Sequence, residues 1–200
     1  MTRKNYLYSG MTLIETLVWI AVFISAMTAL MSSVLYFYRT SNYTIQQASA
    51  TASAQRGIDL MIRTIREASY ASNGAYPIVS IANNDFVFYA DIDADLGIER
   101  VHYYVSGNTL QKGVVEPSGD PPVYSGAEAT STISQDVRNI AQSSSLFAYY
   151  DKDGTLISNF TKIGDVRYVS ANLLVDVDPN KSPIPLSLKS SAALRNLIGK

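Results

Sequence analysis

A stretch of 23 residues without a charged side chain runs from Thr16 to Tyr38. As an α-helix it would be about 35 Å long, enough to cross the roughly 30 Å hydrocarbon core of a bilayer. Arg3 and Lys4 precede it with no acidic residue nearby, and only Arg39 follows it before Arg56. This basic bias predicts a cytoplasmic N-terminus, with the rest of the chain on the other side of the membrane.

Composition excludes several classes of function. The net charge of -1 provides no basic face for nucleic acid, and the absence of cysteine excludes disulfides, thiolate zinc sites and cysteine nucleophiles. The single histidine, His102, lies in the strand-like segment VHYYV, where a structural role is expected. No Ser/His/Asp set can be argued around it, and the scattered single glycines form no phosphate loop. The sequence therefore predicts a protein that is not an enzyme.

Two ordinary explanations of the apolar segment fit it poorly. A secretory signal has an apolar region of about 7–15 residues closed by a small-residue cleavage site, and this segment is longer and has no such site. A plain signal anchor fits the length but leaves Glu15 unexplained. A lone carboxylate in a membrane helix costs several kcal/mol unless it is paired.

The string GMTLIE, from Gly10 to Glu15, stands behind a short basic leader and ahead of an apolar helix. It resembles the prepilin cleavage site of the type IV pilin-like family. The resemblance implies that residues 1–10 are a leader, that prepilin peptidase cuts between Gly10 and Met11, and that Met11 is then N-methylated. The chain departs from the family in one position, because Met11 stands where phenylalanine is usual.

Cleavage would explain Glu15. It creates an amine on Met11, expected one helical turn before the carboxylate, which it can neutralise within one chain or in a neighbouring subunit, as the family model holds. Apolar side chains around Glu15 are expected to anchor the helix in the membrane and later to pack in a filament core: Leu13, Ile14, Leu17, Val18, Trp19, Ile20, Val22, Phe23 and Ile24.

The helix is expected to continue well beyond the membrane segment. No proline occurs before Pro77, and Ile45–Tyr70 is rich in helix-tolerant residues. Its second half carries an apolar stripe at 3/4 spacing, made of Ile58, Met61, Ile62, Ile65 and Ala68. We expect one helix over residues 11–70, with its membrane part at about 11–38 and this stripe packed on a sheet.

Beyond Gly74 the apolar period changes to two, which indicates strands. They are expected at 78–81, 86–90, 101–105, 110–115, 146–150, 166–170 and 173–177. A hairpin turn is predicted at 106–108 and another turn at Asp153-Gly154. Glu116–Thr130 is expected to be a loop, followed by a short helix with Ile133, Val137 and Ile140 on one face.

The predicted fold class is α+β and pilin-like, a long N-terminal helix packed on a mostly antiparallel sheet in a head of residues 71–200. The order of elements, the helix SAQRGIDLMIRTIREA, the hairpin after DIDADLGIE and the closing LRN at Leu194–Asn196 resemble larger minor pilins and J-type pseudopilins. Glu15 argues against the K-type tip subunit, which lacks that glutamate.

Four acidic residues alternate in the segment DIDADLGIE: Asp91, Asp93, Asp95 and Glu99. Alternate oxygen ligands in a tight loop can converge on a calcium ion. The pattern is not an EF-hand, because Leu96 stands where the turn glycine belongs and Gly97 comes one residue later. The alternative is an acidic, solvated hairpin loop without metal, and no other cofactor is expected.

The resemblance implies a minor pilin or pseudopilin of a type IV pilus or type II secretion filament. Its expected partners are other pilin or pseudopilin subunits, prepilin peptidase, the inner-membrane assembly platform and the lipid bilayer. Its expected location is the inner membrane, as a single-pass protein with an extracytoplasmic head, and then the filament. The alternative is a signal-anchored extracytoplasmic ligand-binding protein that does not polymerise and keeps residues 1–10.

Overall fold

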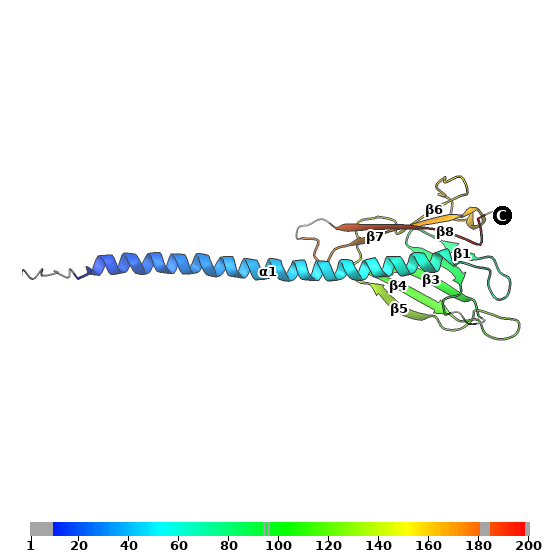
Figure 1. The fold of residues 1–200 in the computed structure, drawn as a ribbon, viewed down its shortest axis with the longest axis horizontal. Coiled ribbons are helices and arrows are strands. Elements are labelled where there is room, and N and C mark those ends of the chain that lie inside the picture. Colours follow the sequence, from blue (N-terminus) through cyan, green and yellow to red (C-terminus); the bar gives the residue numbers. More distant parts are fainter. Residues whose placement is uncertain (1–9, 94, 96, 181–184, 199–200) are drawn as a thin grey trace, which may run out of the picture. The chain divides into compact units, whose positions relative to one another are not determined.

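The computed structural model describes residues 10–93, 95, 97–180 and 185–198. Its elements in order are α1 (Leu13–Arg66), β1 (Ile78–Ile81), β2 (Asp85–Ala90), β3 (Glu99–Ser106), β4 (Thr109–Val115), β5 (Ala129–Ser134), β6 (Phe147–Tyr150), the 3-10 helix η1 (Ile163–Asp165), β7 (Tyr168–Val175) and β8 (Leu186–Ala193). The predicted fold class is confirmed: a long N-terminal helix with an apolar first part packs against antiparallel sheets, an α+β pilin-like architecture (Figure 1). The chain divides into two compact units, residues 1–45 and 46–200, and α1 contributes to both.

Helix α1 is continuous because no proline and only one glycine, Gly57, interrupt it. It begins two residues later than predicted, since Thr12 caps it by accepting a hydrogen bond from the Glu15 amide at 3.3 Å. It ends four residues earlier than predicted. The backbone amide of Ser69 donates to the carbonyl of Tyr89, so the chain leaves the helix by pairing with β2.

The first sheet is an antiparallel meander in the order β1-β2-β3-β4-β5. The predicted turn between β3 and β4 is confirmed, with Gly107 at φ +59°, a conformation that favours glycine. The turn at Gly154 is confirmed in the same way, with φ +76°. A second antiparallel sheet has the order β6-β7-β8.

Three expectations about the strands are wrong. Residues 129–134 form β5 and pair with β4, so Ile133 lies in a strand and not in the predicted short helix. The two strands predicted at 166–170 and 173–177 are one strand, β7, which pairs with β8 without interruption. Strand β8 itself was not predicted, because its sequence LSLKSSAA has only two large apolar residues and the apolar alternation is therefore short.

Hydrogen bonds of the backbone and of one asparagine side chain join the two sheets. The amide of Val137 donates to the carbonyl of Asn108 at 2.9 Å, at the β3–β4 turn, while Arg138 donates to Leu174 of β7 at 2.8 Å. The buried side chain of Asn139 accepts from the Leu174 amide at 2.9 Å and donates to the Asn172 carbonyl at 2.7 Å. Residues 137–139 therefore serve as a polar connector in place of the helix expected there.

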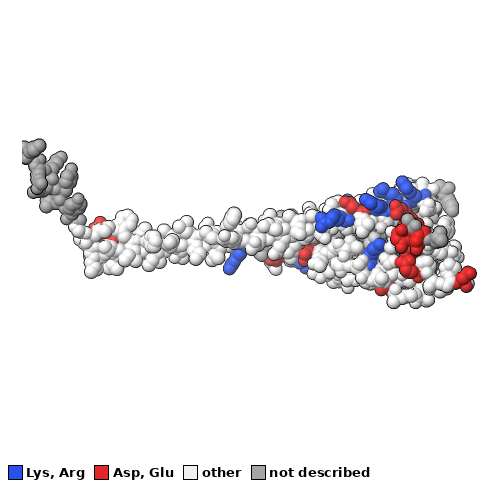
Figure 2. Space-filling view, turned by 60° about the horizontal axis from the view of Figure 1, so that its bottom comes forward, with Lys and Arg blue, Asp and Glu red and all other residues white. Residues whose placement is uncertain are grey.

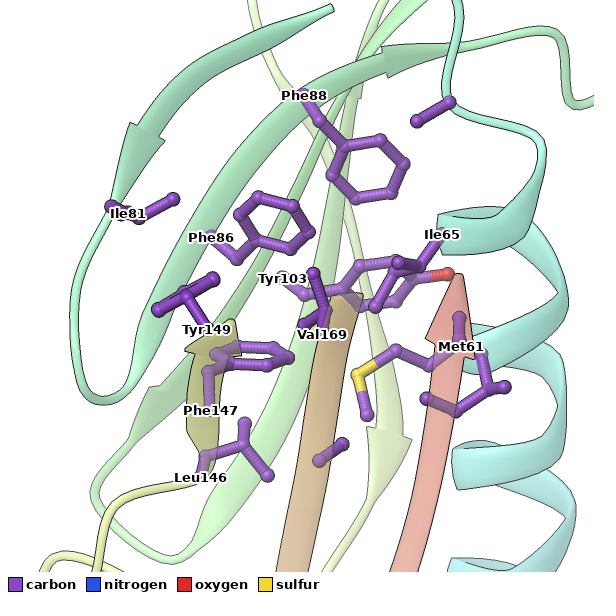
Figure 3. Packing of buried hydrophobic residues seen from close by; sticks show 14 of the residues in the cluster. Met61, Ile65, Ile81, Phe86, Phe88, Tyr103, Leu146, Phe147, Tyr149 and Val169 are labelled. Atoms are coloured by element: carbon purple, nitrogen blue, oxygen red, sulfur yellow. The ribbon is translucent and has the colours of Figure 1, made fainter. Parts of the chain in front are cut away.

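One hydrophobic core contains side chains from the second half of α1 and from both sheets. Figure 3 shows Met61 and Ile65 of α1 pointing toward Tyr103 of β3 and Val169 of β7. Phe86 is fully buried at the centre of an aromatic group, with its ring centroid 4.7 Å from that of Phe88. Each large apolar side chain buried here contributes about 1.5–3 kcal/mol. The predicted apolar stripe on α1 is therefore the face of the helix that packs into the core.

Gly57 allows α1 to approach β5 closely. A Cβ atom at this position would lie 2.7 Å from Cγ2 of Ile133 and 3.3 Å from its carbonyl oxygen. The first distance is shorter than a carbon–carbon contact, and the second involves the backbone of β5 at the register shift in its pairing with β4. A glycine is therefore required where the helix crosses this strand.

We predict that Gly57→Ala destabilises the head despite the higher helix propensity of alanine. The propensity gain is about 1 kcal/mol, whereas overpacking costs about 1–3 kcal/mol, so a net loss is expected. Urea unfolding of the full chain in detergent measures it. In an Ile133→Ala background the clash is relieved and Gly57→Ala is expected to stabilise. A stabilising Gly57→Ala with Ile133 intact would contradict the close approach.

Candidate functional site

The predicted cleavage bond lies just before α1. Gly10 and Met11 are exposed and not helical, and Met11 is 60% exposed. A protease requires an accessible chain outside regular secondary structure, and Gly10 and Met11 are exposed and precede the helix, which begins at Leu13. The rest of the predicted leader, residues 1–9, lies outside the described residues.

Glu15 stands in the first turn of α1 with an exposed side chain. The partial positive charge at a helix N-terminus favours a carboxylate there. Between Gly10 and Tyr38 the sequence contains no Lys, Arg or His, so this segment has no side-chain cation for Glu15. Helical i, i+4 spacing does not bring the Met11 nitrogen to Glu15, since Met11 precedes the helix. Both expected modes of pairing for Glu15, within one chain and with a neighbouring chain, stay predictions for the cleaved protein.

The first part of α1 presents apolar side chains to its surroundings on every side. No described residue from Leu13 to Tyr38 is buried, and one window of the helix has a mean hydropathy of 2.1 with none of it buried. The helix is long and apolar enough to cross a membrane, as predicted. The nine apolar residues expected to form this surface are all at least 54% exposed.

Three hydroxyl groups within this apolar part donate hydrogen bonds to the backbone of the helix itself. Ser25 donates to the carbonyl of Ala21 and Thr28 to that of Ile24, both at 2.8 Å, and Ser32 donates to Thr28 at 2.9 Å. Such bonds to the preceding turn remove the need for water. The segment is therefore suited to a bilayer or to a packed helical core in spite of its hydroxyls.

The acidic loop connects β2 to β3. Oxygen atoms of Asp91, Asp93 and Glu99 all lie within 4.8 Å of one another, so three of the four predicted ligands come together. Asp95 instead accepts a hydrogen bond from the amide of Gly97, which shapes the loop. Glu99 is fully buried, which the sequence did not indicate, and burial raises its pKa, with Glu116 and Asp93 adding to the rise.

His102 lies between two carboxylates. Its Nε2 is 2.8 Å from Asp85 and its Nδ1 is 3.2 Å from Glu128. Glu128 reaches it across β4 because Gly113, which pairs with His102, has no side chain: a Cβ there would overlap the Glu128 carboxylate. Both ring nitrogens can donate at once only in the imidazolium form. His102 thus bridges β2 to the residue before β5, which sequence spacing could not reveal.

A scan against models of known protein families and a search of curated proteins both return no match.

We predict that His102→Ala lowers the free energy of unfolding by about 1 kcal/mol, the upper range for partly exposed ion pairs. His102→Phe is the matched control, because it keeps a ring to stack on Tyr104, whose centroid is 4.3 Å away, and loses both carboxylate contacts. Urea unfolding of the full chain is expected to place both variants below the wild type. Full stability in His102→Phe would show that only stacking matters.

Proposed function

We propose that this chain is a structural, non-enzymatic subunit of a pilin-like filament. The proposal rests on one observation, which is that the two halves of the unbroken helix α1 differ in burial. Its second half belongs to the core of the head, whereas its first half exposes 26 consecutive residues, Leu13–Tyr38, among which only Glu15 is charged. Such a surface needs lipid or other apolar helices around it.

The same apolar surface suits both of the environments that such a subunit meets. In the inner membrane, lipid covers it, with the N-terminus in the cytoplasm and the head outside. In a filament, the same side chains of neighbouring subunits cover one another. The internally bonded hydroxyls of Ser25, Thr28 and Ser32 make either environment acceptable, because neither supplies water.

Proteolytic cleavage would take place between the stay of the subunit in the membrane and its entry into the filament. Prepilin peptidase would cut the accessible bond between Gly10 and Met11, and methylation of the new amine would follow. Glu15 has no side-chain cation in its own segment, so the amine of a neighbouring subunit is the partner that fixes the axial register. The assembly platform of the inner membrane would then move the subunit into the filament.

We propose further that the subunit is a minor pilin or pseudopilin of a type IV pilus or type II secretion system. This assignment rests on the order of elements, with an antiparallel meander after the helix and a second, smaller sheet, together with the sequence resemblance. The head supplies lateral contacts, and a role in priming or capping the filament fits a minor subunit.

We predict that Glu15→Ala leaves cleavage intact and lowers incorporation into filaments at least about tenfold. The amine of the neighbouring subunit would lose its partner in an apolar core, and a tenfold change corresponds to only about 1.4 kcal/mol. Cells producing each variant are sheared, and the subunit is quantified in filament and membrane fractions.

Ser25→Ala is the matched control, because it removes a polar group from the same helix that already bonds within it at 2.8 Å. Its incorporation is expected to equal that of the wild type. Normal incorporation of Glu15→Ala would remove the pairing role. Absence of the wild-type chain from every filament fraction would favour a signal-anchored binding protein, for which the groove of about 530 Å³ between α1 and β5 is the candidate ligand site.

A further inference from the structure

The loop between β2 and β3 concentrates oxygen ligands at one point. Asp91 and Asp93 lie in the loop and Glu99 is the first residue of β3, and one carboxylate oxygen of each lies within 4.8 Å of the others. Calcium binds oxygen at about 2.4 Å, so ligands on opposite sides of the ion are about 4.8 Å apart. The three oxygens therefore fit on the surface of one calcium coordination sphere.

One of the two carboxylate oxygens of Glu99 is buried without a hydrogen-bond donor in the part of the chain that the structure describes. Its side chain has no exposed surface, and its Oε2 accepts a hydrogen bond from the Ile92 amide at 2.8 Å. Its Oε1 is buried and has no hydrogen-bond partner among the described residues. Oε1 faces Gly97, since a Cβ there would lie 3.5 Å from it and 3.1 Å from Oδ1 of Asp95. A buried carboxylate oxygen without a donor is costly unless a cation meets it.

Among the described residues, no Lys or Arg forms an ion pair with Asp93 or Glu99. The charge of Lys112 of β4 interacts favourably with Glu99, and burial lowers the pKa of Lys112. Two further acids, Glu67 and Glu116, line the hollows on either side of Asp93. Figure 2 shows acidic side chains gathered in one group on the head.

We propose that Asp91, Asp93 and Glu99 bind a calcium ion that ties the β2–β3 loop to the first residue of β3. Asp95 stands at the rim, and water or backbone carbonyls complete the coordination. Calcium fits better than zinc because every side-chain ligand is a carboxylate oxygen, and better than magnesium, which retains several waters and takes one or two carboxylates. This inference concerns the head alone and does not depend on the filament.

The test uses the full chain in detergent micelles, stripped with EDTA and then given about 1 mM calcium at constant ionic strength. Differential scanning calorimetry is expected to show the melting temperature of the wild type rising by at least about 2 °C, because calcium binds the folded head. Glu99→Gln and Asp93→Asn are expected to melt at or above the wild type in EDTA, since each removes one of the repelling charges. Both are expected to lose the rise with calcium, and titration calorimetry should give them at least tenfold weaker binding.

Asp153→Asn is the matched control, because Asp153 is an exposed acid in a separate turn, and it is expected to keep the full calcium response. An unchanged wild-type melting temperature with calcium would overturn the proposal. So would a rise in Glu99→Gln as large as that of the wild type, or an equal response of the wild type to magnesium.

Discussion

One unbroken helix with two different solvation requirements is the constraint on which the rest of this structure depends. Helix α1 runs through 54 residues without a proline, and the apolar side chains of its first half are exposed. Its second half supplies Ile58, Met61, Ile62 and Ile65 to the core of the head. The head therefore has its own core, and the apolar side chains of the first half stay exposed on the chain.

The strands that sequence could predict are those with a buried face. Phe86, Phe88, Val101 and Tyr103 alternate with more exposed residues, and this period of two is visible without a structure. The sequence predicts a loop up to Thr130 and a short helix after it where β5 lies, because four of the six residues of β5 are exposed and give no apolar alternation. Strand β8 is equally exposed over much of its length. Edge strands of this kind are defined by backbone pairing with a neighbour, which side-chain patterning does not report.

Some features of the candidate sites could also be predicted from the sequence, and others could not. Gly10, Glu15 and the apolar run are close together in the chain, so their order is visible in the sequence. The alternation of acidic residues from Asp91 to Glu99 is visible for the same reason. The complete burial of Glu99 and its unpaired oxygen depend on the packing of β3 and could not be read from spacing. The bridge from His102 to Glu128 needed the missing side chain of Gly113 on an intervening strand. The start of α1 could have been predicted from Thr12, because a threonine three residues before a glutamate is typical of a helix N-terminus.

Cleavage between Gly10 and Met11 is the central claim, because it alone would give Glu15 a cation and separate a filament subunit from a permanently anchored protein. Intact-mass and N-terminal peptide mass spectrometry of the chain from native membranes tests it most directly. The account predicts a mature chain that begins at an N-methylated Met11 and lacks residues 1–10. A chain that keeps those residues in cells with active prepilin peptidase would contradict the account and favour the anchored binding protein.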